Sequence, residues 1–267
     1  TPCRGDGKGL GEFYTDMIVV ASYAELQAGG YLVPCKVFSP RGGKPDLHGL
    51  KVSKGDYAQR PLEERMDRDE MVGSILDEWK RHAEGRSTVI FASGIDHSLH
   101  IRNEFRLAGI AAEHVDGTTD ILEREGILDK VGDGRVTVLC NYGIATTGID
   151  MPILKYMVCA RPTKSFGLWR QMGGRIQRPY NGHDHCAIQD HSDNAETFGY
   201  PDEDVEWSLD STKKVQHTPQ GQPGDRMPKE PHECPKCGTG YRGPKCPACG
   251  YILPRLAAPV QMAKGSL

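Results

Sequence analysis

The amino-acid sequence predicts an α/β protein: a parallel sheet flanked by helices, followed by a small C-terminal zinc ribbon. Between about residues 67 and 190, short apolar runs alternate with amphipathic stretches. Such alternation is typical of right-handed βαβ units around a parallel sheet. Two Cys-Pro-x-Cys-Gly pairs follow, separated by eight residues, and this spacing is typical of a zinc site with four cysteine ligands.

Hydrophobic spacing divides the α/β part into elements. A helix is expected from residue 67 to about 85, where four apolar side chains recur at helical spacing: Met71, Ile75, Leu76 and Trp79. Further helices are expected near 23–27, 99–109, 120–131 and 165–173. Strands are expected at 87–93, 110–115, 136–140, 154–160 and 185–190. Ligands of parallel sheets bind beyond the carboxyl ends of the strands, so functional residues are expected in the segments that begin at Ser93, Asp116, Asn141 and Arg161.

Changes in composition suggest the domain boundaries. Residues 1–60 are rich in Gly and Pro and are expected to be a connecting region. The α/β lobe is expected over 61–210. Polar residues without apolar spacing indicate a linker over 211–231, followed by the zinc ribbon at 232–252 and a tail at 253–267.

The bulk composition excludes a polycation and a membrane protein. The 267 residues include 33 Lys and Arg against 36 Asp and Glu, a net charge of −3. Any contact with nucleic acid must therefore depend on local placement of groups rather than on overall charge. No apolar run approaches the roughly 18–20 residues that cross a bilayer. Nine cysteines, five of them scattered singly, indicate a reducing compartment, and the cytoplasm is the expected location.

The four clustered cysteines carry the most specific local signal. Cys234, Cys237, Cys246 and Cys249 are expected to bind one Zn²⁺ through thiolates. The glycine after each pair permits the tight turn that points both thiolates at one ion. A closed four-thiolate site leaves no open position for catalysis, so the predicted zinc is structural.

Two polar segments stand where loops would face a ligand. GIATTGIDMP (143–152) follows an expected strand, and RQMGGRIQRP (170–179) overlaps an expected helix. On composition alone, the arginines of the second segment could equally be a solvated face.

The order of these segments resembles the second RecA-like lobe of superfamily 2 helicases. The run RGDGKGLGEF (4–13) and the stretch 187–210 resemble a phage and bacterial subgroup of that family. Ser93-Gly94 stands at the place of motif IV, and Asp116-Gly117-Thr118, with Arg124 six residues on, is similar to the family's Asp-Gly stretch. Residues 148–152 resemble motif V. Motif VI is matched by Gln171, Gly174, Arg175 and Arg178. The resemblance covers roughly residues 1–210, because Thr1-Pro2 also resembles the end of motif III.

The resemblance implies an ATP-dependent helicase, with ATP and Mg²⁺ bound mainly by a preceding lobe. Asp150 would hydrogen-bond the ribose, and the Gly148 backbone would line the cleft between the lobes. Gln171 would contact the phosphates, while Arg175 and Arg178 would be arginine fingers. A guanidinium fixed across a cleft stabilises the charge on a transferring phosphoryl group.

The same resemblance implies contacts with nucleic acid, DNA being favoured over RNA. Ser93, Gly94, Gly117 and Thr118 would contact phosphates, and such contacts carry no sequence information. Many relatives place Thr or Ser where this chain has Tyr142. The hydroxyl contact with nucleic acid is therefore expected from Thr146 or Thr147 instead.

A P-loop, Gly-x-x-x-x-Gly-Lys-[Ser/Thr], is absent from the sequence. The chain is therefore expected to be inactive as an ATPase without an N-terminal RecA-like lobe of the same protein. Two alternatives stay open at this stage: a translocase that does not unwind, as in restriction or remodelling systems, and a nucleic-acid-binding module without a motor.

Overall fold

The structure is a computed structural model that describes residues 3–40, 45–53, 55–83, 85–144, 150–212, 232–241, 246 and 248–252. Its centre is a six-stranded parallel sheet with the order β1-β8-β7-β4-β6-β5. The strands are β1 (Cys35–Phe38), β4 (Thr88–Ala92), β5 (Ala112–Val115), β6 (Val138–Asn141), β7 (Tyr156–Ala160) and β8 (Cys186–Asp190). This confirms the predicted α/β class, and the arrangement is that of a RecA-like lobe.

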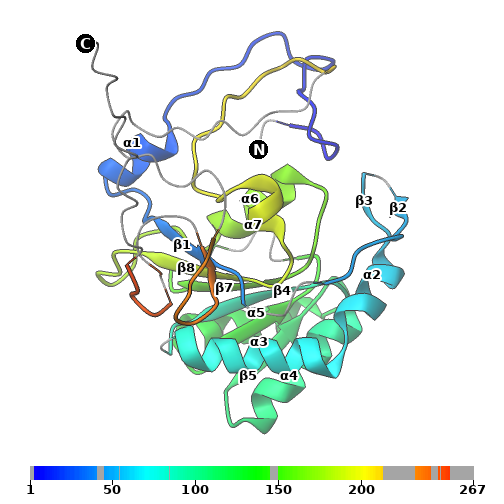
Figure 1. The fold of residues 1–267 in the computed structure, drawn as a ribbon, viewed down its shortest axis with the longest axis vertical. Helices are drawn as coiled ribbons and strands as arrows, with labels where there is room; N and C mark the ends of the chain where they lie inside the picture. The colour runs from blue at the N-terminus through cyan, green and yellow to red at the C-terminus, as the bar shows by residue number, and fades with distance from the viewer. Residues whose placement is uncertain are drawn as a thin grey trace, which may run out of the picture.

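Helices cover both faces of the sheet (Figure 1). One face packs against α3 (Asp69–His82) and α4 (Ile95–Leu107). The other packs against α5 (Ile121–Gly132), α6 (Phe166–Gly174) and α7 (Asn194–Phe198). Every residue of β4, β6, β7 and β8 is buried, as expected for parallel strands enclosed on both sides.

The predicted helices and strands of the lobe are confirmed, with small differences at their ends. In α3 the buried stripe is Val72, Ile75, Leu76 and Trp79, so Val72 rather than Met71 begins it. In α4, Ile101 and Phe105 are buried but Leu107 is 81% exposed, because the helix ends there and leaves the sheet.

The region before residue 61 is more ordered than the expected connecting region. α1 (Tyr23–Ala28) is the short helix that was predicted, and a capping box formed by Ser22 and Glu25 begins it. Beyond it, β1 pairs with β8 over the whole register from Cys35–Cys186 to Phe38–Gln189 and becomes the sixth strand. Three further elements were not predicted: β2 (Val52–Ser53), β3 (Asp56–Tyr57) and α2 (Gln59–Met66).

The N-terminal segment lies beside the end of the lobe, as the blue and yellow traces at the top of Figure 1 show. The amide of Gly9 donates to the carbonyl of Asp210 (3.1 Å) and that of Gly11 to Leu209 (2.7 Å). A Cβ at Gly9 would lie 2.4 Å from the carbonyl oxygen of Ser208, so the close approach requires glycine there.

The cysteine-rich module docks on the sheet. Its hairpin of β9 (His232–Glu233) and β10 (Gly240–Tyr241) meets the chain after β1 through an antiparallel bridge between Ser39 and Gly240. The predicted linker lies outside the described residues except for Ser211 and Thr212, and the predicted tail lies wholly outside them. Among the described helices, none is long and apolar enough to cross a membrane.

Candidate functional site

The segments expected to carry function follow the carboxyl ends of neighbouring strands. Ser93 follows β4, Asp116 follows β5, Tyr142 follows β6 and Arg161 follows β7. Because all these strands are parallel, the four segments lie along one edge of the sheet. This is the edge at which ligands of open α/β sheets bind.

Ser93 points into the protein. Its side chain is buried, and its hydroxyl donates to the carbonyl of Ala160 at the end of β7 (2.8 Å). Its amide donates to Nδ1 of His97 (3.3 Å), which identifies the tautomer with a proton on Nε2. Burial lowers the pKa of His97 to about 3, so this imidazole is neutral and serves as an acceptor.

The next residue, Gly94, lies at the N-terminus of α4 beside a carboxylate from α2. A Cβ at Gly94 would lie 1.9 Å from the Glu63 carboxyl group. Oε1 of Glu63 accepts a hydrogen bond from the amide of His97 (3.2 Å). An anion is favoured at such a helix end, and in this structure Glu63 supplies it. No local sequence pattern indicates this long-range contact.

Asp116 organises the turn that contains Gly117 and Thr118. Its Oδ1 accepts from the amide (2.6 Å) and hydroxyl (2.7 Å) of Thr118, and its Oδ2 lies 3.0 Å from Nε2 of His114. Burial opposes ionisation of the carboxyl group, but hydrogen bonds from Thr118 and His114 lower its pKa to about 2. The guanidinium of Arg124 donates to the carbonyl of Asp116 (3.2 Å). Gly117 and Thr118 are thereby presented at the surface.

Two residues of the expected nucleotide site are in contact. The guanidinium of Arg178 forms an ion pair with the carboxylate of Asp150, which joins the segments 143–152 and 170–179. The ammonium of the buried Lys155 donates to the carbonyl of Arg178 and so fixes the backbone that carries the arginine.

The segment that leads to these arginines is held by α6. Ser165 caps the helix, its hydroxyl accepting from the amide of Leu168 (3.3 Å). The indole of Trp169 donates to the carbonyl of Gly199 (2.9 Å). Gln171 is exposed on the helix. Arg175 is the first residue after the helix, and burial lowers its pKa. Gln177, by contrast, is buried.

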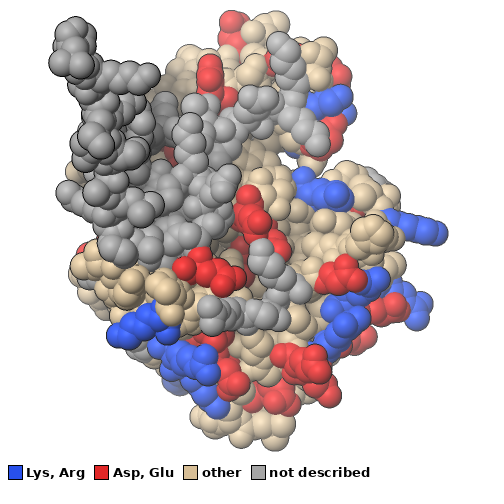
Figure 2. Space-filling view, in the orientation of Figure 1, with Lys and Arg blue, Asp and Glu red and all other residues tan. Residues whose placement is uncertain are grey.

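Part of the loop between β6 and Asp150 lies outside the described residues. The residues outside the described part include Thr146, Thr147 and Gly148, which the sequence predicts as contacts. At the start of this loop the guanidinium of Arg161 lies over the ring of Tyr142, 5.4 Å from its centroid. Figure 2 shows Lys and Arg interspersed with Asp and Glu on the face in view, in agreement with the small net charge.

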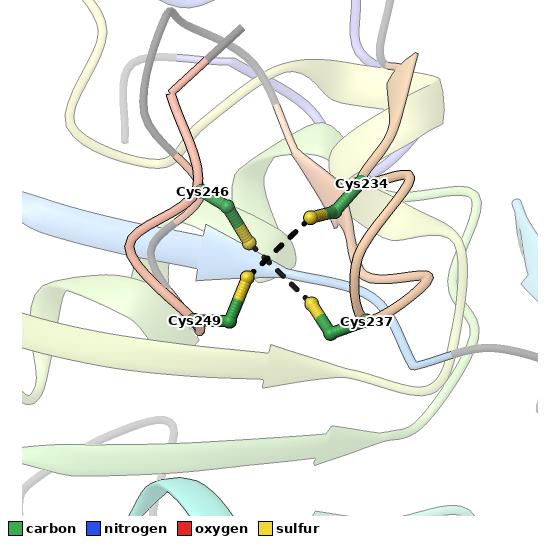
Figure 3. Close-up of side chains that lie close together, drawn as sticks. All are labelled: Cys234, Cys237, Cys246 and Cys249. Atoms are coloured by element: carbon green, nitrogen blue, oxygen red, sulfur yellow. Dashed lines mark hydrogen bonds between the residues drawn. The ribbon is translucent and has the colours of Figure 1, made fainter.

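The four cysteines of the ribbon converge on one point (Figure 3). Their sulfur atoms all lie within 4.8 Å of one another, with 3.5 Å between Cys234 and Cys249 and 3.6 Å between Cys237 and Cys246. Four thiolates around Zn²⁺ at about 2.3 Å would lie about 3.8 Å apart in a tetrahedron. The donor set and its spacing therefore fit zinc.

The two knuckles have the same backbone. The amide of Cys234 donates to the carbonyl five residues later (2.9 Å), and that of Cys246 does the same (2.7 Å). The glycine that follows each pair has positive φ, 73° at Gly238 and 72° at Gly250, a region that other residues seldom adopt. Burial opposes ionisation of Cys234, yet the amides of Cys237 and Lys236 lower its pKa to about 6. Burial raises the pKa of Cys246 to about 12, so a metal ion would have to displace the proton of that thiol.

Comparison with known proteins agrees with this geometry. Residues 67–180 match the family model described as the helicase conserved C-terminal domain. A 51.5 kDa protein of a Lactococcus phage (isolate 7-9) is 28% identical over 253 residues, covering 94% of this chain and 54% of the phage protein. IRC3 of Saccharomyces cerevisiae, assigned as an ATP-dependent helicase, is 34% identical over 148 residues, covering 54% of this chain and 22% of IRC3. The chain thus spans about half the length of the phage relative and a smaller part of the yeast one.

A solved structure shows the same fold. It is a fragment of an HsdR subunit assigned to a type I restriction enzyme from Vibrio vulnificus YJ016. The two structures match with a TM-score of 0.59 and 21% sequence identity. The match covers 76% of this chain and 40% of the HsdR chain. At this identity the likeness concerns the fold alone. Together, the family match and the sheet topology show that residues 67–180 belong to a helicase conserved C-terminal domain with a RecA-like fold, similar to the domain of superfamily 2 helicases.

Proposed function

We propose that this chain supplies the second lobe of an ATP-driven motor that translocates on nucleic acid and unwinds it. The observation that carries the proposal is the ion pair between Asp150 and Arg178. It brings together a carboxylate suited to a ribose hydroxyl and a guanidinium suited to a phosphate, on the strand-end edge of a RecA-like sheet.

In this proposal the chain's own residues act on ATP that a first lobe binds with Mg²⁺. Arg175 and Arg178 stabilise the negative charge of the transferring phosphoryl group, Gln171 contacts the phosphates, and Asp150 accepts from the ribose. The Gly148 backbone lines the cleft. Because the sequence contains no P-loop, we expect no ATPase activity from the isolated chain.

The nucleic-acid track is proposed to follow the turns after β4 and β5. Gly94, Gly117 and Thr118 are placed there, and the adjoining loop contributes Thr146 or Thr147. Contact by the Ser93 hydroxyl would require its hydrogen bond to Ala160 to break, so we assign Ser93 to holding β4 and β7 together. Such backbone contacts suit DNA and RNA alike, and competition between single strands of each, at equal salt, decides which is preferred.

The ribbon is proposed to bind one structural Zn²⁺ through Cys234, Cys237, Cys246 and Cys249. Zinc supplies the folding energy of so short a module when bound. We also propose that the lobe extends from β1 to about residue 210, so that only the segment before β1 connects it to the preceding lobe.

The arginine pair provides the test. In the full-length protein, Arg178→Ala should lower kcat for ATP hydrolysis by about 10³-fold, within the range that arginine fingers supply, with nucleotide-free binding of nucleic acid unchanged. Arg135→Ala is the matched control, because Arg135 also pairs with an aspartate (2.6 Å to Asp133) but lies after α5. Unchanged turnover together with weakened nucleic-acid binding would place Arg178 on the track instead. A strand-separation assay on the same protein distinguishes unwinding from translocation alone.

A further inference from the structure

Two cysteines outside the zinc cluster lie side by side in the sheet. Cys35 begins β1 and Cys186 begins β8, and the two residues are register partners in this parallel pair. Their Sγ atoms are 2.9 Å apart. Both are free thiols in the structure. The fold brings them together although they are 151 residues apart along the chain.

The geometry is close to that of a disulfide. A bond requires an S–S distance of about 2.04 Å and Cα atoms about 4.4–6.8 Å apart. Neighbouring strands are about 4.7–4.9 Å apart, so register partners already meet the second condition. For the bond to form, the two Sγ atoms, now 2.9 Å apart, would have to approach by about 0.9 Å.

Access to the pair is asymmetric. Cys186 is buried, whereas Cys35 is half-buried on the edge strand of the sheet. A reagent therefore reaches Cys35 first, and Cys186 lies in position to resolve the product. The ammonium of Lys155 lies close enough to interact electrostatically with both sulfur atoms. Burial raises the pKa of Cys35 well above its usual range, so the reaction is expected to be slow at neutral pH.

We propose that Cys35 and Cys186 are a reversible oxidation site that takes small-molecule disulfides and fastens β1 to β8. The Cys35 thiolate attacks one sulfur of the small disulfide, forming a mixed disulfide and releasing one thiolate. The Cys186 thiolate then attacks the Cys35 sulfur, and the second thiolate leaves. In sum, two protein thiols lose two protons and two electrons, and the small disulfide takes them up as two thiols.

The bond would act at a junction of the fold. The chain that leaves β1 carries Ser39, which bridges to Gly240 of the zinc ribbon. Lys155, beside the thiols, also donates to the carbonyl of Arg178. Oxidation would thus fix the strand on which the ribbon docks, next to the arginine segment.

Peptide mapping of the zinc-loaded chain tests the proposal. The reduced chain is incubated with glutathione disulfide at alkaline pH, denatured with an alkylating reagent and digested without reductant. We expect one linked peptide pair, Cys35 with Cys186, two hydrogens lighter than the separate peptides, and four alkylated ribbon cysteines. The oxidised chain should unfold at a higher urea concentration than the reduced chain.

Variants separate the two roles. Cys186→Ser should stop at a glutathione adduct on Cys35 and lose the redox-dependent shift in the urea midpoint, while Cys35→Ser should form neither adduct nor link. Cys140→Ser, the same change at another buried strand cysteine, should behave as the wild type. Recovery of both wild-type thiols in alkylated form, with the zinc retained, would overturn the proposal, and so would a link from Cys35 to any other cysteine.

Discussion

Gly173 in α6 offers a sharp test of how the arginine segment is positioned. A Cβ at Gly173 would lie 2.4 Å from Cβ and Cγ of Pro201, whereas ordinary contacts begin at 3.4 Å. Gly173→Ala must therefore separate the helix from the proline by about 1 Å. Neither a helix backbone nor a proline ring gives way easily. The neighbouring residue, Gly174, has no such contact, since a Cβ there would meet nothing within 4 Å.

The expected magnitude follows from two opposing terms. Overpacking a tightly filled site costs about 1–3 kcal/mol. Replacing glycine by alanine in a helix gains up to about 1 kcal/mol. Gly173→Ala should therefore lower the free energy of unfolding by up to about 2 kcal/mol. Gly174→Ala keeps the helix term but not the clash, so the difference between the two variants isolates the packing term.

Urea unfolding of the zinc-loaded chain, followed by tryptophan fluorescence, measures this difference. Trp169 lies on the same helix and is fully buried, so its emission reports the loss of α6 packing. We expect the Gly173→Ala midpoint to lie well below that of Gly174→Ala, with equal m-values. If the two variants agree within about 0.5 kcal/mol, the contact between α6 and Pro201 is not the tight packing that the distances at Gly173 imply.

Three further predictions use other parts of the structure. Chelation of zinc should unfold the ribbon but shift the lobe's melting transition only slightly, because the described contact with the lobe includes one bridge from Ser39 to Gly240. Calorimetry measures both transitions, and loss of both together would contradict this prediction. Glu63→Gln should tighten nucleic-acid binding several-fold in a salt titration, because a carboxylate beside Gly94 repels phosphate; unchanged affinity would exclude this turn from the track. The pKa of Asp116 is about 2 in the folded chain and about 3.9 in the unfolded chain. The ionised Asp116 therefore stabilises the fold above pH 4, and this contribution is lost as the pH falls towards 2. Urea midpoints of Asp116→Asn should depend less on pH over that range than those of the wild type.

Local patterns account for what the sequence could predict. The strands β4, β6, β7 and β8 are buried on both faces, so apolar runs such as 154–160 are recognisable as strands from the sequence. The zinc ligands are also local, since each knuckle needs only five consecutive residues and ends in one glycine with positive φ. The resemblance to helicase lobes likewise rests on short motifs in order.

Long-range contacts account for what the sequence could not predict. β1 is only four residues long and stands between Pro34 and Pro40, so its signal is that of a loop until β8 pairs with it. Glu63 belongs to a polar helix, and nothing local connects it with the amide of His97. The Ser93 hydroxyl looked available for a phosphate, but a partner 67 residues away in sequence takes it.

The ribbon's place on the sheet bears on how metal can affect the whole chain. Its described contact with the lobe includes two backbone hydrogen bonds, 3.2 and 3.1 Å, between Ser39 and Gly240. At about 0.5–1.5 kcal/mol each, they contribute little to the stability of a lobe with its own two-sided core. The same bonds, however, cover backbone groups next to an edge strand, and open edges pair readily with other chains. Loss of zinc should therefore increase association between copies of the chain more than it destabilises the lobe, and light scattering of the chelated protein below its melting temperature would separate these two effects.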